Sequence, residues 1–457
     1  MAQLVDELPD LLASWLPEQT WFADGNRAIS LVRVTASIAL LTGEPALDLV
    51  LLRVEFADGG TAEDYQLLVG RRRLLSNDLQ DKTIGMIGDT IAYDALWDPY
   101  VADWLLNELA NADTYQSLRF TRELGAEVPY GVKGRVLSED SIKTTLAYDN
   151  ECTLKLFRRA TPDVNLDLEF HRALRKLSSK HIVQLRAAIE LKWDDDPVTL
   201  GMLQNFVSSP ADGWAMAMVS VRDLLHSEQD LPADQVGGDF AGEAFRLGQA
   251  VATTHVDLAQ AFGTSDQDPC DLVEAMNARF SVAESTVPTL SGYASRIRAA
   301  YAEVRKLDVR ISTQRIHGNL HLHNVLRTPS GWLLINFGGA SASPLFEKAQ
   351  SASVLRDVAG MLLSLDHAAH QRRANFGRND KLSSQLERRA DEWSARNRSA
   401  FCDGYTEFAE IDPSDQAALL VAYELDSSVY ECINNAHKGS NRHNNTLSSI
   451  SRLTANL

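Results

Sequence analysis

The chain has 457 residues, which is long enough for several domains of about 100–200 residues each. Its 44 lysines and arginines against 62 aspartates and glutamates give a net charge of −18, which disfavours broad binding to nucleic acid or to an anionic membrane. Four scattered cysteines, an acidic N-terminus and no apolar run of 18 residues argue against zinc, secretion and membrane insertion, so a cytoplasmic protein is expected.

The first hundred residues predict mostly strands. Leu52, Val54 and Phe56 alternate with polar neighbours, and alternation returns at 65–69 after a turn signal at 58–60. This period of two around a short glycine-containing turn is typical of a hairpin with one buried face. We therefore expect a β-rich N-terminal cap over residues 1–100.

Residues 101–207 predict a small α/β lobe. The segment begins with a helical pattern, followed by strands at 144–148 and 153–157 around an Asp149-Asn150 turn. A helix is expected over 166–177, and another strand over 199–206.

Residues 208–457 predict a mainly helical lobe. The helical period appears over 215–226, 239–262, 268–284, 291–307 and 381–410. The exception is 316–337, where a loop leads into short strands at 325–327 and 332–337. Asparagine-rich stretches at 434–435 and 441–445 suggest a polar, mobile tail.

One lysine and one glutamate of the small lobe suggest nucleotide chemistry. Lys155 lies in an expected strand and Glu169 in the helix that follows. Kinases use a strand lysine, fixed by a helix glutamate, to hold ATP phosphates. Alone this signal is weak, because such pairs are more often ordinary surface ion pairs.

The loop at 317–324 carries the more informative pattern. A kinase catalytic loop needs an acid that orients the hydroxyl, an amide five residues later, and a second acid after the next hairpin. Asn319, Asn324 and Asn336 have this spacing. All three are amides, so the spacing is present without the acids.

With these residues in view, the sequence resembles the actinobacterial maltokinases, within the aminoglycoside-phosphotransferase branch of the protein-kinase-like fold. The resemblance covers nearly the whole chain and implies an α+β, bilobal fold with an N-terminal β-rich cap. The segments that carry it are Trp15–Gln19 with Trp21–Ala23, Leu154–Arg159, Asp167–Glu169, Met202–Phe206, Asp212–Trp214, Ser220–Leu224, Gly238–Glu243, Leu355–Leu362, and Tyr423–Asp426 with Val429–Glu431.

The resemblance implies roles for the residues of the nucleotide site. Lys155 would hold the ATP phosphates, and Glu169 would fix Lys155. The linker between the lobes would contact adenine through backbone groups of Gln204, Asn205 and Phe206. In the loop, Asn319 would orient the sugar hydroxyl, while Asn324 and Asn336 would hold Mg²⁺.

The departures from the family pattern lie at the positions that would carry out the chemistry. Asn319 and Asn336 stand where the family has aspartates, and Asn205 where it has a glutamate. An amide cannot accept a proton, and loss of a general base lowers the rate by about 10²–10⁴-fold. An amide oxygen is also a weaker Mg²⁺ ligand than a carboxylate. Ser427 and the 441–444 segment differ from the family as well.

The sugar pocket is expected on the segment 423–431, through Tyr423, Glu424, Asp426, Tyr430 and Glu431. The competing interpretation is a helix with a solvated acidic face.

Three functions are consistent with these patterns. The first is ATP-dependent phosphorylation of maltose to maltose 1-phosphate, weak or absent because of Asn319 and Asn336, with ATP and weakly bound Mg²⁺ as cofactors. The second is a pseudokinase that binds trehalose synthase as a scaffold. The third is a kinase for another sugar, such as glucosamine.

Overall fold

The computed structural model describes residues 2–22, 27–140, 143–161, 165–193, 196–226, 233–235, 238–338, 351–371, 380–409, 411–437 and 443–455. The chain forms two compact units. The first comprises Met1–Arg172 and Val183–Ser208, and the second comprises Ala173–Ile182 and Ser209–Leu457. The three-part division at residues 100 and 207 stays a prediction. No described helix is both long and apolar enough to cross a membrane.

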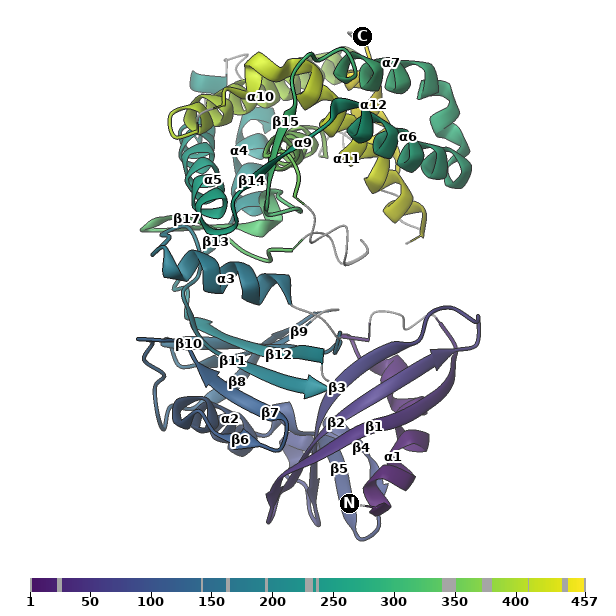
Figure 1. Cartoon of the computed structure of the whole chain (residues 1–457), viewed down its shortest axis with the longest axis vertical. Helices are drawn as coiled ribbons and strands as arrows, with labels where there is room; N and C mark the ends of the chain where they lie inside the picture. Colours follow the sequence, from purple (N-terminus) through teal and green to yellow (C-terminus); the bar gives the residue numbers. More distant parts are fainter. Residues whose placement is uncertain are drawn as a thin grey trace. The chain divides into compact units, whose positions relative to one another are not determined.

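The first unit begins with a five-stranded antiparallel cap sheet (Figure 1). Its strands are β1 (Ile29–Thr42), β2 (Ala46–Phe56), β3 (Glu63–Arg72), β4 (Thr83–Ile87) and β5 (Thr90–Asp94), in the order β1-β2-β3-β5-β4. The expected hairpin is β2–β3, in which Leu52 pairs with Tyr65. Its alternating apolar side chains share one core, as their period of two predicts. The expectation of a single buried face is wrong, because Leu49, Leu51 and Leu68 on the other face are buried in a second core.

A helix that the sequence pattern did not predict covers the cap. α1 (Ala2–Trp15) lies along the cap sheet in Figure 1. Leu4, Leu8 and Leu12 follow a four-residue spacing and are all buried with the cap core. Short 3₁₀ turns follow at Leu16–Glu18, Asn77–Lys82 and Ala95–Trp97.

A second, seven-stranded antiparallel sheet completes the first unit. It contains β6 (Thr114–Tyr115), β7 (Leu118–Arg122), β8 (Gly134–Glu139), β9 (Lys143–Tyr148), β10 (Cys152–Phe157), β11 (Leu185–Trp193) and β12 (Asp196–Asn205), in the order β6-β7-β11-β12-β10-β9-β8. The expected strand pair is β9–β10, and Asp149 in its turn has a positive φ of 45°. The helices are α2 (Pro99–Asn111) and α3 (Leu166–Lys176).

The second unit is mainly helical. It contains α4 (Gly213–His226), α5 (Ala241–Phe262), α6 (Pro269–Thr286), α7 (Ala294–Val304), α9 (Leu355–Gln371), α10 (Asp380–Thr406), α11 (Ala417–His437) and α12 (His443–Leu453), with 3₁₀ turns at Ala233–Gln235, Pro288–Tyr293, Leu322–Asn324 and Pro413–Gln416. The five helices expected from the period are α4, α5, α6, α7 and α10. The tail expectation is wrong for Asn434 and Asn435, which are helical in α11.

Two glycines explain why α5 and α10 pack so closely, as Figure 1 also shows. A Cβ on Gly248 would lie 2.1 Å from the carbonyl oxygen of Phe401, and a Cβ on Gly404 would lie 2.0 Å from that of Phe245. The two backbones therefore touch directly, and α10 holds the middle of α5 in place.

Short sheets position the loop that follows. β13 (Ala211–Asp212), β16 (Val325–Thr328) and β17 (Gly331–Leu334) form one sheet, and β14 (Thr264–Gln267) pairs with β15 (Ile311–Gln314). The strand expected over 332–337 ends earlier, at Leu334. Asn336 has a φ of 62°, a left-handed conformation that cannot continue a strand.

Candidate functional site

A buried carboxylate at the start of α9 holds the 317–324 loop. Asp357 accepts the backbone N–H groups of His317 at 2.7 Å and Gly318 at 2.9 Å, and the Nε2–H of His255 at 3.1 Å. Burial alone would raise the pKa of Asp357, but the hydrogen bond and charge of His255 outweigh it and the pKa is lowered. Asp357 is therefore a charged anchor for the first turn of the loop.

The rest of α9 continues this support. A Cβ on Gly360 would lie 2.7 Å from the Leu320 carbonyl oxygen, so a side chain there would push the loop away. One turn later, the Ser364 hydroxyl accepts the Leu322 N–H at 3.1 Å. The sequence already favoured Asp357 as a brace of this loop rather than a reacting group, and the hydrogen bonds to His317 and Gly318 agree with that role.

The structure joins the side-chain amides of Asn324 and Asn336, and it joins Asn324 to the backbone of Asn319. Asn336 Nδ2 donates to Asn324 Oδ1 at 3.0 Å, and Asn324 Nδ2 donates to the Asn319 backbone oxygen at 2.8 Å. The second Nδ2 hydrogen of Asn324 points to His321 Nε2 at 3.2 Å. Asparagine tolerates the left-handed φ of Asn336 better than most residues. The result is a closed, hydrogen-bonded amide pair at 324 and 336.

Two histidines of the loop, His317 and His321, make structural hydrogen bonds. His317 Nε2 donates to the Ile335 oxygen at 2.9 Å, while its Nδ1 accepts the Asn319 N–H at 3.3 Å. Burial, with help from His317 and His323, lowers the pKa of His321 to about 4. His321 is therefore uncharged at neutral pH and can accept the Asn324 amide hydrogen.

His323, for which the sequence suggested no role, faces outward with 54% of its side chain exposed. Its ring stacks on Trp214 with centroids 4.9 Å apart, and its Nδ1 lies 3.7 Å from Asp212 Oδ1.

The described residues of the loop do not fit a conventional Mg²⁺ site. Asn324 and Asn336 offer neutral oxygens, and Asn324 Oδ1 already accepts one hydrogen bond. Asp357, the carboxylate under the loop, is used by backbone N–H groups and His255. Nowhere in the described part of the chain do three His, Cys, Asp or Glu residues cluster in a way that could hold a metal. Mg²⁺ prefers anionic oxygens, which this loop lacks.

In the first unit, Lys155 lies on β10 and faces a carboxylate of α3. Its Nζ is 3.9 Å from Asp167 Oδ2, and the other Asp167 oxygen lies 3.2 Å from His171 Nδ1. Burial lowers the pKa of Lys155, and the charge of Asp167 opposes this shift. Sequence reasoning assigned the carboxylate role to Glu169, about half a turn further along α3. That pairing stays a prediction, and Asp167 is the partner that sequence reasoning missed.

The 204–206 segment has fewer free backbone donors than expected. The Asn205 N–H donates to the Gln184 oxygen at 2.9 Å, and the Phe206 N–H to the Glu151 oxygen at 3.1 Å. Gln204 is buried in β12. The N–H groups of Asn205 and Phe206 are therefore not available to adenine, and the expected contact would have to use carbonyl oxygens.

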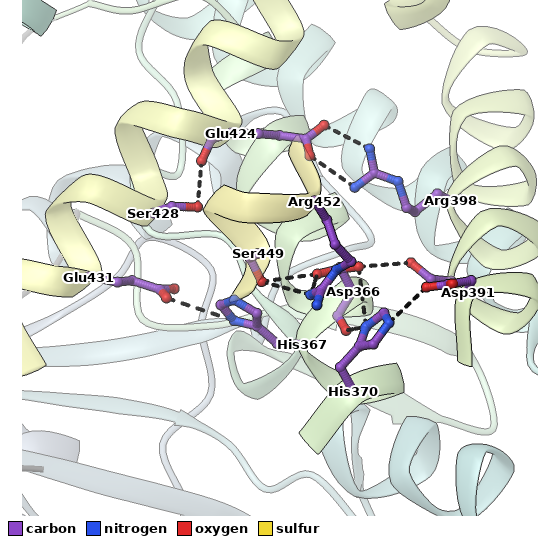
Figure 2. A network of polar contacts seen from close by, with 11 residues as sticks. Asp366, His367, His370, Asp391, Arg398, Glu424, Ser428, Glu431, Ser449 and Arg452 are labelled. Atoms are coloured by element: carbon purple, nitrogen blue, oxygen red, sulfur yellow. Dashed lines mark hydrogen bonds and ion pairs between the residues drawn. The ribbon is translucent and has the colours of Figure 1, made fainter. Parts of the chain in front are cut away.

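Two of the acids expected in the sugar pocket are buried and paired with arginines. Glu424 is 1% exposed and accepts two hydrogen bonds from Arg398, at 3.0 and 2.8 Å (Figure 2). Asp426 accepts two from Arg279, at 3.0 and 2.7 Å. The alternative of a solvated acidic face is therefore wrong for both residues. Their expected sugar contacts stay predictions, although both carboxylates are already occupied by arginines.

The remaining three residues of that set differ in exposure. Tyr423 is buried, and burial raises the pKa of its hydroxyl, which stays protonated. Tyr430 is half-buried, and Glu431 lies 3.8 Å from His367 Nδ1 (Figure 2). Of the 441–444 segment, Asn441 and Arg442 lie outside the described residues.

A polar network ties α9 to α10 and α12, as Figure 2 shows. Asp366 of α9 accepts hydrogen bonds from Ser449 and Arg452 of α12. His370 donates from Nδ1 to the Asp366 backbone oxygen at 2.8 Å and from Nε2 to Asp391 of α10 at 3.0 Å. Both ring nitrogens therefore act as donors, which is the state of a charged imidazolium.

This network predicts a pH dependence of stability. Burial would lower the pKa of His370, but Asp366 outweighs burial and the pKa is raised. The folded protein thus holds this proton more tightly than the unfolded chain does. The contribution of His370 is complete below its unfolded pKa of about 6.5 and is lost as pH rises through the folded value. Urea unfolding of wild type and H370Q from pH 5 to 9 should show the difference between them shrinking with pH. A constant difference would contradict this assignment.

Comparisons with known proteins agree with this architecture. Residues 15–98 match the maltokinase N-terminal cap domain. The whole chain shares the fold of a solved glucosamine kinase in complex with glucosamine, ADP and inorganic phosphate, with a TM-score of 0.67, 20% identity and 98% coverage of both chains. The expected kinase-like α+β fold with a β-rich cap is thereby confirmed.

Two curated glucosamine kinases are similar in sequence. The protein of Streptacidiphilus jiangxiensis is 30% identical over 230 residues, which cover 48% of this chain and 49% of that one. The protein of Mycolicibacterium smegmatis (strain ATCC 700084 / mc(2)155) is 26% identical over 187 residues, covering 38% and 44%. The chain thus spans about half the length of the curated relatives it matches.

Proposed function

We propose that the protein binds ATP and a sugar on a sugar-kinase fold, and transfers the phosphoryl group far more slowly than a kinase that carries both loop acids. The observation that carries this proposal is the hydrogen-bonded amide pair of Asn324 and Asn336. Phosphoryl transfer needs an anionic oxygen at position 336. This chain has a neutral amide there, which donates a hydrogen bond to the neutral amide of Asn324.

The protein's own residues can still bind and orient reactants. The Lys155 ammonium, with Asp167 beside it, supplies a positive charge for nucleotide phosphates. The Asn319 amide can accept a hydrogen bond from a sugar hydroxyl and so orient it, but it cannot take the proton. Asp357 keeps the loop in place through backbone N–H groups, independently of the amides.

Glucosamine is the first candidate sugar, and maltose is the second. The two curated relatives described above are glucosamine kinases, and the solved structure whose fold matches 98% of this chain is a glucosamine kinase as well. Maltose is supported by the match of residues 15–98 to the maltokinase cap domain.

A second candidate function is a binding protein without turnover. The same closed amide pair favours it, since nothing in the described loop replaces the missing acids. The resemblance of the sequence to maltokinases suggests trehalose synthase as the partner. Co-purification of the two proteins, with turnover absent on all sugars, would support this candidate.

Calorimetric titration with ATP tests the nucleotide half of the proposal. Because the loop lacks anionic metal ligands, we expect ATP to bind with nearly the same Kd in Mg²⁺ and in EDTA. K155M should weaken binding in both conditions, because it removes the phosphate-facing charge. K133M is the matched control, since Lys133 pairs with Asp103 at an exposed site of the same unit. Absence of heat in both conditions, or binding that requires Mg²⁺, would contradict the proposal.

A further inference from the structure

The cap sheet is hydrogen-bonded to the residues just beyond the strand that carries Lys155. The Gln66 N–H of β3 donates to the Arg158 oxygen at 2.9 Å, and the Ala160 N–H donates back to the Asp64 oxygen at 2.9 Å. These bonds pair β3 with the residues that directly follow β10. The cap is therefore joined to the end of β10 by backbone hydrogen bonds, three residues beyond Lys155.

A buried side chain of the cap strengthens this junction. The side-chain amide of Gln66 donates to the Phe157 oxygen of β10 at 2.5 Å and to the Leu200 oxygen of β12 at 2.6 Å. Gln66 is 5% exposed, so water does not compete for these bonds. One cap residue thus holds two neighbouring strands of the second sheet.

Arg158 is the centre of the junction. Its side chain is 2% exposed and donates to Asp94 of the cap at 2.6 Å, to Glu139 at 3.1 Å and to the Thr144 hydroxyl at 2.8 Å. Its guanidinium also lies over the Trp21 ring, 4.4 Å from the centroid. The fixed fork of one arginine therefore links the cap strand β5, the strands β8 and β9, and the segment that precedes the cap sheet.

Stability alone is a poor explanation for such a cluster. Buried ion pairs are often matched or exceeded in stability by apolar residues of similar volume, because the charges lose their hydration. The cluster instead provides a fixed geometry, because the planar guanidinium of Arg158 can reach its acceptors in only one orientation. That geometry fixes the end of β10 and, through the strand, the position of Lys155.

We propose that Arg158 is a positioning residue, through which the cap sets the place of the Lys155 amine for nucleotide phosphates. The inference rests on the proposed function in one respect, that Lys155 faces those phosphates. The cap then belongs to the nucleotide site, although none of its residues is assigned a contact with nucleotide.

Two readouts on two variants test this role. R158M leaves Asp94 and Glu139 without their arginine and is expected to lower Tm. The deciding variant is therefore R158M/D94L, which removes the buried Asp94 charge, while Glu139 keeps the hydrogen bonds from the Thr20 and Thr144 hydroxyls. We expect R158M/D94L to recover stability but to raise the Kd for ADP by roughly tenfold. We also expect it to change the rate at which formaldehyde and borohydride methylate Lys155, measured by mass spectrometry. R159M is the matched control, because Arg159 pairs with Glu63 at the exposed side of the same junction.

The proposal is overturned if R158M/D94L is folded and matches wild type in both ADP affinity and Lys155 methylation. It is also overturned if R158M/D94L cannot fold, since the cluster would then act as a stability element, or if R159M weakens ADP binding equally. If wild-type protein fails to bind ADP, the proposed function fails. The methylation rate of Lys155 then still decides the role of Arg158.

Discussion

The double variant N319D/N336D is expected to phosphorylate its sugar far faster than wild type. The carboxylate introduced at position 319 would restore a proton acceptor, which contributes about 10²–10⁴-fold once the metal ligand at position 336 is restored as well. The carboxylate introduced at position 336 would accept hydrogen bonds from the Asn324 amide instead of donating to it, and would present the anionic oxygen that Mg²⁺ prefers. Each single variant should gain little, because proton removal and charge neutralisation are needed in the same step. The double gain should therefore exceed the product of the single gains.

ADP release with glucosamine and maltose measures this gain. N107D/N277D is the matched control, because it adds the same two charges at partly buried asparagines outside the loop. A double variant that is folded and binds ATP but stays inert would contradict the account. It would show that the sugar side has diverged too, and Ser427 would be the first position to examine.

The local parts of the fold follow from the sequence for a simple physical reason. The period-two alternation at 52–69 can bury its apolar side chains only on one face of a strand pair, and β2–β3 is that pair. The helical period likewise predicts α5, whose residues Ala244, Leu247, Val251 and His255 are all buried. The spacing of the three loop asparagines predicts that they lie close together, and the structure shows this for the side chains of Asn324 and Asn336 and for the backbone of Asn319.

The parts that could not be predicted depend on distant contacts. Glu424 and Asp426 have an acidic pattern, but only the folded chain shows that Arg398 and Arg279 reach them. The support of the loop by the Ser364 hydroxyl joins residues 42 positions apart. Two carboxylates lie on α3, so their order along the chain does not decide which one meets Lys155. The Arg158 cluster likewise joins four separate segments of the first unit.

The slow turnover expected of the wild-type protein follows from one neutral network. Asn319 offers no base, and Asn324 and Asn336 bond to each other and offer no charge. The neighbouring His321 has a pKa of about 4 and is held as a neutral acceptor of the Asn324 amide, so it does not replace the missing acids. Loss of the base alone lowers the rate by at least about 10²-fold. The missing acids do not prevent the binding of sugar or nucleotide, because binding requires no proton transfer.

Steady-state ADP release by the wild-type protein, with saturating ATP, Mg²⁺ or Mn²⁺ and a panel containing glucosamine, maltose and glucose, tests this account most directly. The expected turnover is at least about 10²-fold below the ordinary kinase range of ~1–100 s⁻¹. K155M serves as the blank for background ATP hydrolysis. Turnover within the ordinary range on any of these sugars would contradict the account, because it would require a catalytic carboxylate that residues 317–324 and Asn336 do not supply.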